Sequence, residues 1–186
     1  MMHEGLLCDL PRYGRLIPAS PNFMAILEFC QWLQETQVGT SIRESTLLFP
    51  ILEGSHLLGL GVSAGTIAIS DLRMMGLIFK KQKATEVMGG LLPFTIAGFV
   101  FMTITGLLLF WSEPIKCYES LWFRLKVLFL FLAAVNAGVF HLTIWRTMDR
   151  WADQLPPPTG ARWAGFMSLL LWGLVIAAGR TTAYNI

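Results

Sequence analysis

The chain has 186 residues, of which 54% are hydrophobic and only 14% are charged, and its formal net charge is +2. A soluble domain of this size needs more polar surface than such a composition supplies. The nearly balanced charge provides no basic surface for nucleic acid. We therefore expect one all-α integral membrane protein that contacts the lipid bilayer and does not bind nucleic acid. The cysteines, Cys8, Cys30 and Cys117, lack metal-ligand spacing and are expected to be isolated thiols.

Residues 1–45 are expected to form an N-terminal arm and an interfacial amphipathic helix. The arm, Met1 to Ala19, has two prolines and no usable periodicity, whereas Ser20-Pro21 is typical of a helix start. From Asn22 to Glu35, apolar residues recur at helical spacing opposite glutamates and glutamines. This pattern favours a helix lying in the plane of the membrane surface, and a helix docked on a partner subunit explains it equally well. Val38-Gly39-Thr40 is expected to end the helix.

Residues 46–186 are expected to form a four-helix membrane bundle. About 20 apolar residues cross a hydrocarbon core of about 30 Å, and the chain offers four such stretches. Asp71 and Arg73 are expected to end the first stretch, and three consecutive prolines form a stiff connector before the last. The expected spans are residues 47–70, 88–111, 121–145 and 163–179.

The basic residues indicate how the bundle is oriented. The two loops that follow the first and third spans share one side, which carries Arg73, Lys80, Lys81, Lys83, Arg146, Arg150 and Arg162. The other side carries Arg43, Lys116, Arg124, Lys126 and Arg180, and it also receives Arg12 and Arg15 from the arm. Because residues close to the spans decide orientation, we expect both termini to lie on the outer side.

An ionisable side chain within the first span requires an explanation. Such a group is costly in hydrocarbon unless it is paired, ligated or hydrated. His56 shares one helical face with Glu53, Gly59, Ser63, Thr66 and Ser70. In a membrane bundle a neutral histidine is a typical axial ligand of haem iron or of a chlorophyll-type magnesium, and Glu53 is then expected to hold the second ring nitrogen. The alternative is that His56 and Glu53 satisfy each other without a cofactor.

Four further residues are candidates for the same cofactor site or for a second one. His141 lies near the far end of the third span, roughly 15 Å from His56 along the membrane normal at about 1.5 Å per residue, so one iron is not expected to bind both. Lys126, near the start of that span, can reach toward the level of His56. Arg73 and Arg146 are candidates to bind propionates or other carboxylates near His141.

Other chemistries find less support in the sequence. We find no nucleophile motif, phosphate loop, carboxylate dyad or metal triad, so no catalytic activity of its own is expected. The nine methionines form no repeated ligand pattern, which argues against copper transport. Proton transport through Glu53 and His56 would need a continuous polar path, and the other spans do not show one.

The stretch from Leu52 to Gly76, LEGSHLLGLGVSAGTIAISDLRMMG, resembles an uncharacterised family of bacterial four-span inner-membrane proteins with a Glu, a His-Leu-Leu-Gly-Leu run and a downstream Asp-Leu-Arg. The resemblance extends through residues 105–110 and the Lys126 region, and it implies the fold and a bacterial inner membrane. A first-span His followed by glycine, a Leu-Lys pair and a later His are more distantly similar to HemJ-type protoporphyrinogen oxidases and CopD-type membrane proteins. The HemJ-type resemblance implies a b-type haem on His56, with Lys126 as the corresponding lysine.

The function expected from these features is that of a small b-type cytochrome-like membrane subunit. It would ligate haem b through His56 and either transfer electrons or dock in a larger membrane redox complex. One alternative is a cofactor-free structural or assembly subunit bound to other membrane protein subunits, which the N-terminal arm favours. The other is an accessory subunit that binds a chlorophyll-type pigment.

Overall fold

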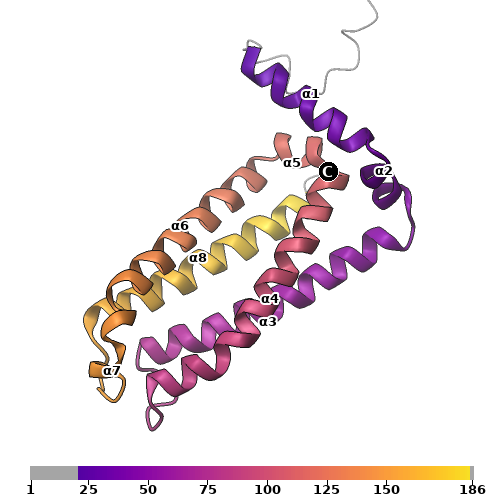
Figure 1. The fold of residues 1–186 in the computed structure, drawn as a ribbon. Coiled ribbons are helices and arrows are strands. Elements are labelled where there is room, and N and C mark those ends of the chain that lie inside the picture. The colour runs from indigo at the N-terminus through magenta and orange to yellow at the C-terminus, as the bar shows by residue number, and fades with distance from the viewer. Residues whose placement is uncertain (1–20, 185–186) are drawn as a thin grey trace, which may run out of the picture.

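The computed structural model describes residues 21–184, and this part of the chain contains helices and no strand. Four elements are long and apolar enough to cross a membrane: α3 (Leu48–Met74), α4 (Ala84–Ser112), α6 (Leu121–Thr143) and α8 (Thr159–Tyr184) (Figure 1). Large hydrophobic side chains are exposed along all four, as expected of helices that face lipid. The prediction of an all-α integral membrane protein is confirmed, whereas the arm predicted over residues 1–19 lies outside the described residues.

Three of the membrane helices, α3, α4 and α8, extend beyond the predicted spans, whereas α6 ends at Thr143, two residues before the predicted position 145. α3 continues to Met74, so Asp71 and Arg73 lie within the helix and do not end it. α4 begins four residues before the predicted position 88, and α8 begins at Thr159, directly after the prolines of the connector. α6 is followed by η1 (Trp145–Thr147) and α7 (Met148–Trp151). Hydropathy marks only the part of each helix that lies in hydrocarbon, while the helix itself continues into the more polar interface.

Two short helices, α1 (Pro21–Glu35) and α2 (Gln37–Glu44), lie beyond the start of α3, at what we call the α1 end of the bundle (Figure 1). The prediction that residues 38–40 end the first helix is wrong, because they lie within α2. The break falls at Thr36, whose hydroxyl accepts a hydrogen bond from the Gly39 N–H at 3.3 Å and so caps α2.

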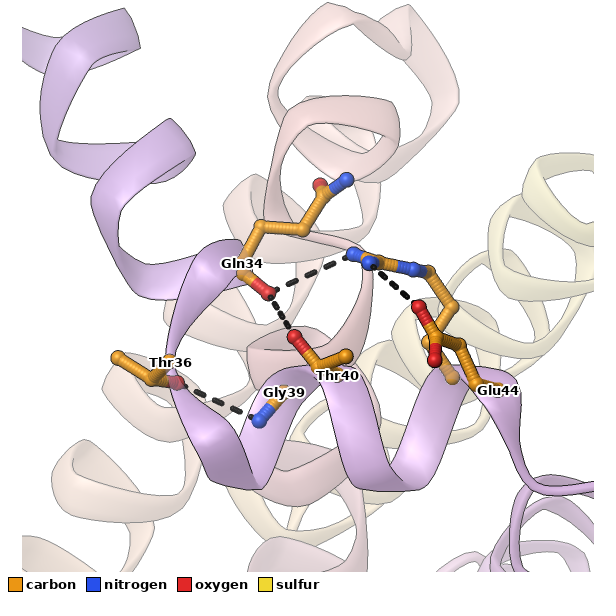
Figure 2. A network of polar contacts seen from close by, with 6 residues as sticks. Gln34, Thr36, Gly39, Thr40 and Glu44 are labelled. Carbon is orange, nitrogen blue, oxygen red and sulfur yellow. Dashed lines mark hydrogen bonds and ion pairs between the residues drawn. The ribbon is translucent and has the colours of Figure 1, made fainter.

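The turn between α1 and α2 is fixed by the last carbonyls of α1. The Gln34 carbonyl accepts hydrogen bonds from the Thr40 hydroxyl and from the Arg43 guanidinium, each at 3.4 Å (Figure 2). The Trp111 indole of α4 donates to the Thr36 hydroxyl at 2.8 Å. A Cβ on Gly39 would lie 3.1 Å from the Trp111 carbonyl, so this glycine lets α2 rest directly on the end of α4.

The two described cysteines lie at the α1 end, outside the membrane helices. Cys30 of α1 is buried and Cys117 of α5 (Pro114–Glu119) is partly buried, and α1 packs on α5. Burial raises the pKa of both thiols, and for Cys117 burial together with nearby Glu113 raises the pKa to about 11. Both thiols are therefore protonated at neutral pH and poor as nucleophiles.

The four membrane helices are arranged as two pairs. α3 packs along α4, α6 packs along α8, and the pairs join mainly through α3 and α8. Near the α1 end, Phe110 of α4 stacks on Phe123 of α6 with ring centroids 5.7 Å apart. At the opposite end, which we call the α7 end, a buried apolar cluster comprises Met74, Ala84, Met88, Phe140, Met148, Trp151, Ala152 and Ala161. This end is the best packed part of the bundle.

The contact between α3 and α4 depends on two glycines. A Cβ added to Gly98 would lie 2.9 Å from the backbone nitrogen of Ser63, and one on Gly59 would lie 3.2 Å from that of Met102. Backbone atoms cannot move aside as a flexible side chain can. The two glycines therefore set how closely the helices approach and which residues face each other across them.

We expect Gly98→Ala to lower the free energy of unfolding by about 1 to 3 kcal/mol, because the added methyl group overpacks this contact. Gly89→Ala is the matched control on the same helix, since nothing lies within 4 Å of a Cβ there. It should be neutral or stabilising by up to about 1 kcal/mol, the difference in helix propensity. Equilibrium unfolding in mixed micelles gives the unfolding free energy of both variants. Equal changes in the two would contradict the close contact of α3 with α4 at Gly98.

Candidate functional site

His56 lies in the interior of the α3–α4 pair, eight residues into α3 from the α1 end. Its Nδ1 is 2.9 Å from the Met102 carbonyl oxygen and 3.2 Å from the Thr105 hydroxyl, both on α4. Because a carbonyl oxygen only accepts hydrogen bonds, Nδ1 carries the proton and is the donor. The lone pair of the neutral ring is then on Nε2, which has no hydrogen-bond partner within residues 21–184.

A glycine of α4 makes room for the imidazole. A Cβ on Gly106 would lie 2.9 Å from Cε1 of His56, so any side chain at that position would displace the ring. The Thr105 hydroxyl donates to the carbonyls of Phe101 and Met102, which leaves its oxygen free to accept from the ring. α4 thus fixes both the position and the tautomer of the imidazole.

The role expected of Glu53 falls to other residues. Glu53 is predicted to hold the second ring nitrogen, but that nitrogen is bound by Met102 and Thr105, and no hydrogen bond joins Glu53 to His56 among the described residues. The sequence alone does not predict these α4 partners or Gly106. The available signal was the Thr105-Gly106 pair within an otherwise apolar span, since a glycine there permits close approach of a neighbouring group.

Lys126 lies on the inner side of α6, close to α8 and to the level of His56. A Cβ on Gly179 of α8 would lie 3.6 Å from its Nζ, and Lys126 lies five residues into α6 from the α1 end. The side chain is partly buried and has no ion pair within the described part of the chain. An imidazole with a free lone pair and an unpaired ammonium group therefore lie in the same region of the bundle.

His141 is remote from this region. It lies two residues before the end of α6 and is exposed, with its ring 5.2 Å from that of Trp145. His56 lies eighteen residues before the end of α3. At about 1.5 Å per residue the two histidines differ by roughly 24 Å along the helices, so the structure does not bring them together.

The two arginines predicted near His141 differ in accessibility. Arg73 is only 1% exposed, and its guanidinium donates to the Gln82 carbonyl at 2.8 and 3.2 Å and to the Ala152 carbonyl at 3.1 Å. It holds two loops of the α7 end together, which leaves only a buried Nη1 without a partner among the described residues. Arg146 in η1 is exposed and remains accessible to a carboxylate.

Asp71 is a buried carboxylate that sequence analysis treated only as a span boundary. It is 3% exposed, and its Oδ2 has no hydrogen-bond partner within the described residues. A Cβ on Gly165 would lie 2.8 Å from the Asp71 carbonyl oxygen, which explains how α8 approaches so closely.

Neither clustered metal ligands among the described residues nor similarity to known proteins adds to these assignments. No set of three or more His, Cys, Asp or Glu side chains within residues 21–184 is arranged to hold a metal ion. The candidate site therefore presents a single imidazole with a free lone pair on Nε2, and the ammonium group of Lys126 lies at the same end of the bundle. Comparisons of the chain with protein-family models, with curated proteins and with solved structures found no match.

Proposed function

We propose that the chain is a small membrane b-type cytochrome-like subunit in which His56 is an axial ligand of haem b. One observation carries the proposal: within a membrane helix, the Met102 carbonyl holds Nδ1 of His56 at 2.9 Å and leaves Nε2 as the free lone pair. Metal-ligating histidines commonly donate their other ring N–H to a carbonyl, which orients the ring and increases its basicity. Bound haem would supply one-electron redox chemistry.

The residues around His56 fit the needs of a haem ligand. Gly106 keeps the ring against α4, and Thr105 supports the same tautomer. The unpaired ammonium group of Lys126 would offer a cation to the carboxylates of a porphyrin. In this proposal the protein acts in electron transfer or as a docking subunit of a larger membrane redox complex, in keeping with the HemJ-type and CopD-type resemblance.

The proposal is tested by an optical spectrum and pyridine extraction of the purified, full-length protein. We expect a Soret band and the pyridine haemochrome of haem b at about one haem per chain. A chlorophyll-type spectrum would show that the same imidazole binds a magnesium pigment and not haem. A colourless protein, obtained from cells supplied with haem, would reject the cytochrome-like function in favour of a cofactor-free subunit.

A structural or assembly subunit is the second candidate because α1 presents an apolar stripe outside the membrane helices. Its exposed members are Ile26, Phe29 and Trp32. This stripe suits either the lipid interface or another membrane protein subunit. If a stoichiometric partner co-purifies with the wild type and is lost on Phe29→Ser and Trp32→Ser substitution, α1 binds another membrane protein subunit and the structural role is supported.

We also propose a bacterial inner membrane location with both termini on the outer side. The basic residues of the loops at the α7 end support this orientation. A C-terminal fusion to a reporter that is active only in the periplasm tests it, because activity is expected and its absence would reverse the orientation.

A further inference from the structure

A hollow of about 310 Å³ opens at the α7 end, where the end of α3 meets the start of α8. Its lining residues are Met75, Leu77, Thr159, Arg162, Trp163 and Phe166. The hollow is separate from the His56 region, which lies toward the opposite end of α3. Because α8 begins at Thr159, the hollow lies at the level where a membrane helix passes from the polar interface into hydrocarbon.

Close contacts at two glycines hold the walls of the hollow in place. Gly76, next to two lining residues, has a φ of 74°, and a Cβ there would lie 2.8 Å from Cδ of Pro157. The loop after α3 therefore lies directly against the proline connector before α8. One turn deeper, Gly165 brings α8 against the backbone of Asp71. The hollow is consequently a feature of the fold and does not depend on one side-chain rotamer.

The lining combines an unpaired cation with exposed aromatic surface. The Arg162 guanidinium makes no hydrogen bond or ion pair within residues 21–184, and no acidic residue lines the hollow. The rings of Trp163 and Phe166 lie 5.8 Å apart and nearly perpendicular, and they are 60% and 42% exposed. Leu77 exposes 55% of its surface on the facing wall. One side of the site is thus cationic and the other is apolar.

We propose that this hollow binds one anionic phospholipid. Arg162, with the Thr159 hydroxyl beside it, contacts the phosphate of the head group, and an acyl chain lies along Trp163, Phe166 and Leu77. A basic pocket between membrane helices at the interface suits an anionic head group. The exposed aromatic pair favours an attached acyl chain over a free phosphate ion. This site does not depend on the proposed haem site.

The test measures lipid preference in the purified protein. Wild-type chain is placed in nanodiscs that contain phosphatidylcholine and phosphatidylglycerol with identical acyl chains, and retained lipid is counted by native mass spectrometry. A basic residue near the membrane surface contributes about 1 kcal/mol, so a preference of roughly fivefold for phosphatidylglycerol is expected. Arg162→Gln should remove this preference. Phe166→Ala should reduce retention of both lipids and leave their ratio unchanged.

Arg150→Gln is the matched control, because it removes the same charge from an exposed position in α7 at the same end of the bundle. It should keep the wild-type preference. Equal losses in the two arginine variants would show a diffuse electrostatic effect and overturn the site, as would an unchanged preference in Arg162→Gln. Displacement of the lipid by excess inorganic phosphate would assign the hollow to a free anion and reject the lipid.

Discussion

His56→Ala is expected to abolish haem binding by the purified protein, with loss of the Soret band and of extractable haem. Alanine removes the only imidazole within residues 21–184 that is held inside the bundle with a free lone pair, and Lys126 alone does not supply a haem ligand of this kind. The variant should still fold, because Met102 and Thr105 keep their positions within α4 through the helix's own hydrogen bonds. Circular dichroism and gel filtration in detergent would check this.

Imidazole rescue distinguishes a lost ligand from a damaged fold. The space beside Gly106 that holds the ring in the wild type is left open in His56→Ala, so added imidazole should restore part of the haem spectrum. Thr103→Val is the matched control on α4, since Thr103 is exposed and its hydroxyl donates only to the Phe99 carbonyl. An unchanged Soret band in His56→Ala would reject His56 as the proposed haem ligand.

Arg73→Ala should cause the largest loss of stability, about 3 to 5 kcal/mol of unfolding free energy. The substitution leaves a buried void and removes three charge-assisted hydrogen bonds from the carbonyls of Gln82 and Ala152. Equilibrium unfolding in mixed micelles, followed by tryptophan fluorescence, gives the difference. The spectrum of any bound haem in the folded fraction should not change, because His56 lies far along α3.

Two further variants make the Arg73 result specific. Arg73→Lys keeps the charge but lacks the planar guanidinium that reaches both carbonyls, so it should recover less than half of the lost stability. Arg150→Ala removes an exposed arginine from the same end and should stay within about 0.5 kcal/mol of the wild type. If Arg73→Ala lowered the unfolding free energy no more than Arg150→Ala, the hydrogen bonds by which Arg73 joins the two loops would not contribute to stability.

Hydropathy was sufficient to predict the membrane helices, but charge misled the prediction of where they end. Arg73 is predicted to end the span because no residue near it in sequence can supply hydrogen-bond acceptors to a buried guanidinium. Its partners are carbonyls 9 and 79 residues further along the chain, which meet only when the α7 end packs. α2 is not predicted for a similar reason. Gly39 indicates a helix break in the sequence, whereas in the fold it allows α2 to approach the Trp111 carbonyl of α4.

In the candidate site, His56 could be predicted from the sequence but its hydrogen-bond partner could not. His56 could be found from sequence because an ionisable side chain in an apolar span is conspicuous. Its partner could not, since local spacing pointed to Glu53 one turn away. The ring instead meets Met102, 46 residues along the chain, because the close approach of Gly59 and Gly98 sets the register of α3 against α4.

The pairing of α3 with α4 and of α6 with α8 has a consequence for biogenesis. Each pair is a helical hairpin of consecutive segments, so each can enter the bilayer as a unit and complete most of its own packing before the other is synthesised. The union of the hairpins through α3 and α8 is then the late step of assembly. Under the proposed function, His56 and its α4 partners all belong to the first hairpin, so the haem ligand is in place before the second hairpin has been translated.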